Sequence, residues 1–122
     1  MKILIVDDSE SLRHAMSELI LSVCKAPVLL EATSVAEGIR LSKTFQVDAV
    51  LLDIRFPDGL GFEVLRAIRQ IRNEIIVIVL TNFTSDQFRE KALAEGADYF
   101  LDKSTDFEKA VEILKEMEAQ IG

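Results

Sequence analysis

Short apolar runs alternate five times with longer amphipathic segments along this chain. In a run such as 3–6 (Ile-Leu-Ile-Val), aliphatic residues follow one another, so a strand formed by them must be buried on both faces. A sheet with one solvated face would mostly alternate polar and apolar residues. The runs therefore indicate strands of a parallel sheet covered on both sides, and they comprise residues 3–6, 28–30, 49–52, 75–80 and 99–101.

The segments between the runs have the 3.6-residue period of amphipathic helices. In the first, one stripe is formed by Leu12, Ala15, Met16, Leu19, Ile20 and Val23. A hydroxyl residue followed three positions later by Glu or Gln predicts a helix start, because the pair satisfies free backbone N–H groups of the first turn. Such pairs are Ser34 with Glu37, Thr84 with Gln87 and Thr105 with Glu108, and Gly96 marks the expected end of the fourth helix.

Five strand–helix units predict an α/β fold of the (βα)5 type. Right-handed crossovers would place helices on both faces of the sheet. The expected form is a flavodoxin-like, doubly wound parallel sheet with strand order 2-1-3-4-5, in which a cleft lies beyond the carboxyl ends of strands 1 and 3. A length of 122 residues fits one domain, residues 1–122, and we expect no separate output domain after the fifth helix.

The charge and cysteine content narrow the functional classes. With 14 basic and 21 acidic residues the net charge is −7, which argues against direct binding to nucleic acid or to an anionic membrane. The single cysteine, Cys24, excludes an internal disulfide and a Cys-rich zinc site. No apolar run is long enough for a signal peptide or a membrane span. We therefore expect a cytoplasmic location.

Polar residues follow the expected strands at their carboxyl ends. Asp7 and Asp8 follow the first strand, Asp53 the third, Thr81 the fourth and Lys103 the fifth. Because strands 1 and 3 are expected neighbours, the three carboxylates should converge and repel one another unless a cation intervenes. Carboxylate oxygens are ligands that Mg2+ prefers, and a lysine with a hydroxyl would complete a phosphoryl-transfer site.

Each of these residues also has a simpler structural interpretation. Asp7 or Asp8 could cap the first helix, and Asp53 could belong to the turn at 57–59. Thr81 could be an ordinary β-branched residue at a strand end, and Lys103 could be a solvated lysine at a helix entrance. Their coincidence at the same edge of the sheet favours a shared site.

Four motifs surround these strand ends, in chain order: 5–9 (Ile-Val-Asp-Asp-Ser), 52–59 (Leu-Asp-Ile-Arg-Phe-Pro-Asp-Gly), 79–81 (Val-Leu-Thr) and 96–103 (Gly-Ala-Asp-Tyr-Phe-Leu-Asp-Lys). Together they resemble the receiver domain of two-component response regulators, the family that includes the chemotaxis response regulator. The resemblance covers essentially the whole chain. One motif alone is moderately specific, whereas all four in order are highly specific.

The resemblance implies a phosphoacceptor and a metal site. Asp53 would accept a phosphoryl group from a phosphohistidine on a histidine kinase or a histidine phosphotransfer protein. Mg2+ would be bound directly by Asp8, by Asp53 and by the backbone carbonyl of Arg55, while Asp7 would act largely through water.

The resemblance also implies a switch rather than a conventional enzyme, although one that assists its own phosphorylation and dephosphorylation. Thr81 and Lys103 would contact the phosphoryl group from two sides, and Phe100 would change rotamer as Thr81 moves. The surface formed by the fourth helix, fifth strand and fifth helix would then change for a downstream protein target, which the sequence does not identify. Either a monomer or a phosphorylation-dependent dimer is compatible with this interpretation.

Four positions depart from the family or tune its chemistry. Arg55 and Phe83 occupy positions that commonly set the rate of aspartyl-phosphate hydrolysis, and Asn82 replaces a smaller residue and would narrow access to the acceptor. Ser104 stands where the family usually has proline after a cis bond. This leaves open a trans bond, which would aim Lys103 less firmly, or a role for Ser104 as the cap of the fifth helix.

Three other functional classes remain for comparison. A phosphorylation-independent protein-interaction module on the same fold is the main alternative, but every charged position of the site is filled. A haloacid dehalogenase-type hydrolase would need a second aspartate at the position of Arg55. Flavin binding is disfavoured because Asp7 and Asp8 would repel the flavin phosphate.

Overall fold

The structure consists of five parallel strands, five longer helices and one short hairpin within the part that the computed structural model describes, residues 1–121. Gly122, the last residue of the expected domain, lies outside the described residues. The parallel strands are β1 (Lys2–Val6), β2 (Val28–Ala32), β3 (Ala49–Leu52), β6 (Ile76–Thr81) and β7 (Tyr99–Asp102). The helices are α1 (Glu10–Val23), α2 (Val35–Thr44), α3 (Phe62–Ile71), α4 (Asp86–Ala94) and α5 (Phe107–Ile121). The hairpin strands are β4 (Arg55–Phe56) and β5 (Gly59–Leu60).

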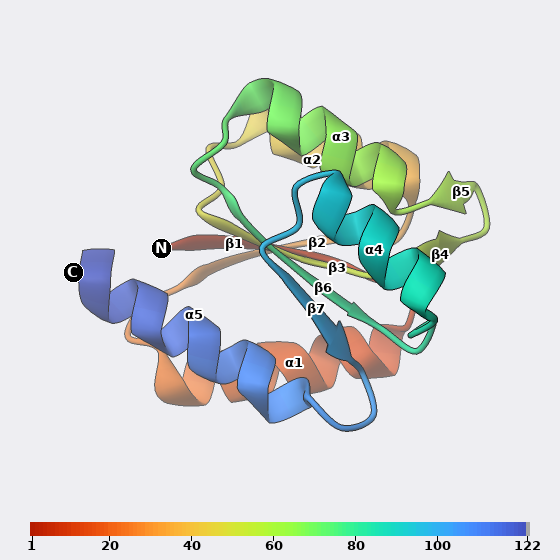
Figure 1. Cartoon of the computed structure of the whole chain (residues 1–122). Coiled ribbons are helices and arrows are strands. Elements are labelled where there is room, and N and C mark those ends of the chain that lie inside the picture. Colours follow the sequence, from red (N-terminus) through yellow and green to blue (C-terminus); the bar gives the residue numbers. More distant parts are fainter. Residues whose placement is uncertain (122) are drawn as a thin grey trace.

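The strand order of the main sheet is β2-β1-β3-β6-β7, which confirms the predicted doubly wound order. Helices α1 and α5 cover one face, while α2, α3 and α4 cover the other (Figure 1). Val6 is paired with Leu52 and Thr81 with Asp102, so neighbouring strands end at the same level. This register brings the residues after β1, β3, β6 and β7 to one edge of the sheet.

Two apolar layers explain why the strand runs lack a polar alternation. Leu4 and Val6 face the layer under α2, α3 and α4, whereas Ile3 and Ile5 face the layer under α1 and α5. Successive side chains of a strand point to opposite faces, so both layers draw on the same short run. The edge strand β2 is less enclosed, and Val28 at its start is 49% exposed. Burial on both faces therefore holds best for the central strands.

The predicted stripe of α1 is confirmed in part. Met16 and Ile20 are fully buried, but Ala15 is exposed. The wrong assignment has a simple cause, because an alanine gains little from burial and lies at the border of the stripe. None of the described helices combines the length and the apolar character needed to cross a membrane.

Two helix starts differ from the predicted ones by one residue or more. Ser34 caps α2 as expected, with its side chain accepting from Glu37 N–H at 3.1 Å. For α4 the cap is Ser85, not Thr84, and its hydroxyl accepts from Phe88 N–H at 3.2 Å. This frame lets Phe88 pack near Phe62, with ring centroids 5.9 Å apart. Tertiary packing thus selects between adjacent hydroxyl residues.

The last helix begins at Phe107, so Thr105 is not its immediate cap. Asp106 precedes the helix, and its carboxylate accepts from Asp102 N–H at 3.0 Å. The expected end of the fourth helix is confirmed, because Gly96 follows it with a φ of +106°. A left-handed backbone of this kind favours glycine.

Candidate functional site

Three carboxylates lie together at the carboxyl ends of β1 and β3. Ligand oxygens of Asp7, Asp8 and Asp53 all fall within 4.8 Å of one another. Asp7 and Asp53 are buried, with 4% and 5% exposure, whereas Asp8 is exposed. Such a group of hard oxygen donors, open to solvent on one side, has the chemistry of a Mg2+ site.

Lys103 supplies the positive charge of this cluster. Its Nζ lies 2.7 Å from Oδ2 of Asp7 and 2.7 Å from Oδ2 of Asp53. The residue follows β7, and its backbone N–H donates to the Thr81 carbonyl at 3.0 Å. Burial alone would lower the pKa of Lys103, but its hydrogen bonds to Asp53 and Asp7 outweigh burial and raise this pKa. The ammonium therefore stays charged while it holds both buried carboxylates.

Burial sets the direction of the pKa shift of Asp7. Desolvation raises its pKa, although hydrogen bonds from Lys103 and from the Ser9 N–H oppose that effect. Apolar side chains, including Leu12 and Leu80, line a small cavity of about 10 Å³ beside it. Ionised Asp7 therefore carries an electrostatic cost, which a bound cation would reduce.

Asp7→Asn should stabilise the protein at neutral pH when divalent cations are removed. A carboxyl with a raised pKa in the folded state stabilises that state at low pH, and this contribution is lost as the pH rises through the folded pKa. We expect a rise of a few degrees in Tm at pH 7, corresponding to about 1 kcal/mol, and no gain below the ordinary aspartate pKa. Thermal melts in EDTA at both pH values test this, with Glu90→Gln, an exposed residue of α4 outside the cluster, as the control. A lower Tm at pH 7 would show that the Lys103 bond outweighs burial.

Two residues that the sequence analysis missed hold the end of β1. The N-cap of α1 is Ser9, whose hydroxyl accepts from Leu12 N–H at 3.3 Å, so the capping interpretation of Asp7 and Asp8 is wrong. The Ser9 N–H donates to Oδ1 of Asp7 at 2.8 Å. Arg13 donates to the Asp7 carbonyl at 2.7 Å. A hydroxyl directly after two aspartates was the available signal for Ser9.

Gly61 is a further missed residue, and it fixes the backbone at Asp53. A Cβ at position 61 would collide with the Asp53 carbonyl oxygen, and the Gly61 N–H donates to the Ile54 carbonyl. Glycine is needed here for close approach of two backbone segments. Oδ1 of Asp53 accepts from Ile54 N–H at 2.7 Å. The two glycines at 59 and 61 indicated a turn, but not this contact.

The turn expected at 57–59 is formed by the β4–β5 hairpin, which the sequence analysis did not predict because two-residue strands show no period. Its Asp58 carboxylate accepts from the N–H groups of Val35 and Ala36 at 2.9 and 3.0 Å. These bonds lower the pKa of Asp58 and attach the hairpin to the start of α2. The turn therefore uses Asp58 and leaves the Asp53 side chain to the acidic cluster.

The predicted rate-tuning residues lie on the segments that follow β3 and β6. The guanidinium carbon of Arg55 lies 4.3 Å from the ring centroid of Phe83, which is a cation–π contact. Thr81 is fully buried, and its Oγ1 accepts from Phe83 N–H at 3.1 Å. Asn82 is exposed. Phe83 thus connects Thr81 with Arg55.

Phe100, the predicted switch aromatic, has its ring inside the core with 5% exposure. Arg89 of α4 lies over it, with its guanidinium carbon 5.6 Å from the ring centroid, and donates to the Phe100 carbonyl at 3.4 Å. A rotamer change of Phe100 on phosphorylation remains a prediction. In this structure the ring is in its inward rotamer, packed in the core.

Ser104 follows Lys103 through a trans bond, since the described residues contain no cis peptide. Its N–H and hydroxyl donate to Oδ1 of Asp102 at 2.9 and 2.7 Å, which lowers the pKa of Asp102. Ser104 does not cap α5, which begins at Phe107. With this trans bond the Lys103 ammonium still contacts both buried carboxylates, so the expected poorer positioning of Lys103 is not seen.

The fold and strand order place the chain among flavodoxin-like α/β proteins, here with an acidic cluster at the switch point of the sheet. The family model described as the response regulator receiver domain matches residues 3–115, and the chain belongs to this family.

Relatives of known name agree with this assignment. The DNA-binding transcriptional activator DevR/DosR of Mycobacterium tuberculosis is 32% identical over 102 residues, which are 84% of this chain and 47% of that protein. The nitrate/nitrite response regulator protein NarL of Escherichia coli K12 is 31% identical over 119 residues, which are 96% of this chain and 54% of that protein. The chain thus spans about half the length of the curated relatives it matches.

Solved structures agree as well. A LuxR-family two-component response regulator from Aurantimonas sp. SI85-9A1 is 28% identical, with a TM-score of 0.86 and coverage of 98% of this chain and 85% of that one. The BeF3-activated receiver domain of DrrB is 27% identical, with a TM-score of 0.82 and coverage of 94% of both chains.

Proposed function

We propose that residues 1–122 act as one receiver domain that takes a phosphoryl group onto Asp53. The donor is the phosphohistidine of a histidine kinase or of a histidine phosphotransfer protein. The observation that carries the proposal is the position of the Lys103 ammonium, 2.7 Å from both Asp53 and Asp7, within a cluster that also includes exposed Asp8. This arrangement provides a nucleophile and opposite charges at one solvent-accessible point.

The donor set fits Mg2+, with two carboxylates as direct ligands and the third acting through water. Asp8 has no hydrogen-bond partner within residues 1–121, so it is available for direct ligation together with Asp53 and the Arg55 carbonyl. The two oxygens of Asp7 accept from Lys103 and from the Ser9 N–H, which favours a role through water. When bound, Mg2+ would supply positive charge beside the transferred phosphoryl oxygens.

In the transfer step a carboxylate oxygen of Asp53 attacks phosphorus. The new O–P bond forms as the P–N bond breaks, and the electron pair of the P–N bond stays on the imidazole nitrogen. The donor leaves as neutral histidine when its second nitrogen carries a proton. Lys103, whose raised pKa keeps it charged, pairs with a phosphoryl oxygen, and the Thr81 hydroxyl donates to another.

The response follows from the added charge of about −1.5 to −2. New acceptor oxygens above Asp53 attract the Thr81 hydroxyl, and the segment 82–85 moves with it toward the site. Phe100 and α4 adjust, so the surface of α4, β7 and α5 is presented to a downstream protein. The net charge of −7 disfavours direct nucleic-acid contact by this domain. A cytoplasmic location and a monomer or phosphorylation-dependent dimer complete the proposal.

The direct test is an intact-mass measurement after incubation with acetyl phosphate and Mg2+. We expect the mass of one phosphoryl group to be added, and removal of divalent cations with EDTA should abolish the adduct because the acidic cluster then repels the anionic donor. Absence of an adduct under both conditions would favour the phosphorylation-independent interaction module.

The contact between Arg55 and Phe83 should set the lifetime of the phosphorylated state. Arg55→Gln and Phe83→Leu each remove the same cation–π contact, so each should accelerate loss of the phosphoryl group by roughly twofold to fivefold. The double variant should lose it no faster than the faster single variant, because one shared contact is removed. Time-resolved mass measurement gives these rates, with exposed Arg40→Gln as the control. Additive effects would show that the two side chains act separately.

A further inference from the structure

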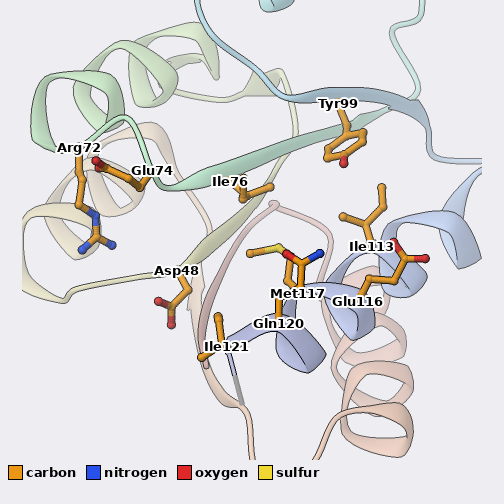
Figure 2. A pocket seen from close by; sticks show the side chains of 10 residues that line it. All are labelled: Asp48, Arg72, Glu74, Ile76, Tyr99, Ile113, Glu116, Met117, Gln120 and Ile121. Carbon is orange, nitrogen blue, oxygen red and sulfur yellow. The ribbon is translucent and has the colours of Figure 1, made fainter.

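A second recessed surface lies at the amino ends of the strands, at the end of the sheet opposite to Asp53. It is a hollow of about 470 Å³ at the amino ends of β6 and β7, and the second half of α5 forms one wall. Figure 2 shows Tyr99 and Ile76 on the strand side, with Ile113 and Met117 facing them from α5. We define these four side chains as the floor of the hollow.

The floor is apolar and incompletely covered. Ile76, Ile113 and Met117 pack against the core but are only half-buried, and Tyr99 remains 40% exposed. Ile121 extends this apolar surface and is 59% exposed. An exposed apolar concavity that joins a helix to strand ends is a typical seat for an amphipathic segment.

The rim of the hollow is acidic. Asp48, Glu74 and Glu116 line it, and none of them forms an ion pair in the described part of the chain. Among the described lining residues the positive side chain is Arg72, whose Nη2 donates to the neutral Val47 carbonyl at 2.7 Å and which therefore keeps its full charge. Three carboxylates against one guanidinium still leave the lining with a net negative charge.

We propose that this hollow binds a basic amphipathic helix of a partner protein, with apolar side chains on the floor and lysine or arginine beside the carboxylates. Charge complementarity supports this occupant over nucleic acid or an anionic membrane, both of which the rim would repel. A second copy is also disfavoured, because a twofold interface would place Glu74 and Glu116 opposite the same acidic rim. The hollow shares β7 and α5 with the surface proposed above for the downstream protein, but binding here does not require phosphorylation of Asp53.

The probe is a synthetic helical peptide of about 18 residues, roughly five turns, with leucines along one face and lysines on both flanks. Fluorescence anisotropy of the labelled peptide measures binding to the whole chain. We expect saturable binding that weakens with salt, and little binding of the same peptide with glutamates in place of lysines. Asp53→Asn should bind the basic peptide as well as the wild type, which separates this proposal from the phosphoacceptor function.

The paired variants localise the interaction. Glu74→Lys with Glu116→Lys should weaken peptide binding by at least about fivefold, because attraction is replaced by repulsion. Glu18→Lys with Glu90→Lys makes the same change in net charge at exposed sites outside the hollow and should have a much smaller effect. Tyr99→Ser tests the floor and should also weaken binding, and circular dichroism of every variant verifies its fold. Equal loss in both charge variants, equal binding of the acidic peptide, absence of binding or concentration-dependent dimerisation through the hollow would each overturn the proposal.

Discussion

Asp53→Asn is expected to eliminate labelling by acetyl phosphate in the presence of Mg2+. The amide is nearly the same size as the carboxylate but is not a nucleophile, so the adduct rate should fall at least about 100-fold. The variant should remain folded, because Lys103 keeps Asp7 as its second partner at 2.7 Å. Intact-mass measurement over time gives the rate, and circular dichroism verifies the fold.

Asp86→Asn is the matched control for this experiment. Asp86 is an exposed carboxylate in the first turn of α4, so the same chemical change there should leave labelling unaffected. If Asp53→Asn still acquires one phosphoryl group, the acceptor lies at another residue. Fragmentation of the labelled peptide would then locate it.

The second large effect is expected for Lys103→Met in the absence of divalent cations. This change leaves Asp7 and Asp53 buried without their shared positive partner. Breaking a buried ion pair from one side costs about 3–5 kcal/mol, so urea unfolding in EDTA should shift strongly to lower concentration. Millimolar Mg2+ should restore much of this loss, because it binds the folded state at the same carboxylates.

Exposed Lys109→Met in α5 serves as the control and should unfold like the wild type. The pH gives a second check on Lys103→Met. Its unpaired carboxylates can take up protons at low pH, so its loss relative to the wild type should be larger at pH 8 than at pH 5. An equal loss with and without Mg2+ would contradict the placement of the metal at this cluster.

The fold was predictable because its main signals are local in the sequence. Buried parallel strands leave continuous aliphatic runs such as 49–52, and the connecting helices have a 3.6-residue period. The alternation of aliphatic runs with helical segments gives the order of the elements along the chain. The preference for right-handed crossovers then restricts the order of the strands in the sheet. The proximity of Asp7 to Asp53 was predictable for the same reason, since both follow adjacent strands.

The remaining features depend on contacts through space. Neither glycine spacing nor composition indicates that Gly61 abuts the Asp53 carbonyl, or that Asp58 binds the start of α2. The start of α4 was misplaced by one residue because Thr84 and Ser85 are chemically equivalent caps, and the packing of Phe88 decides between them.

The hydrogen bond at Thr81 affects the free energy that this domain needs to change its conformation. A hydroxyl has two lone pairs and one proton, and the Phe83 N–H uses only a lone pair of Thr81. The proton remains free, and an accepted bond makes it a better donor. The Thr81 hydroxyl can therefore donate to a phosphoryl oxygen without first breaking another hydrogen bond, and a serine at this position would keep that ability. A valine would instead leave the Phe83 N–H without its acceptor.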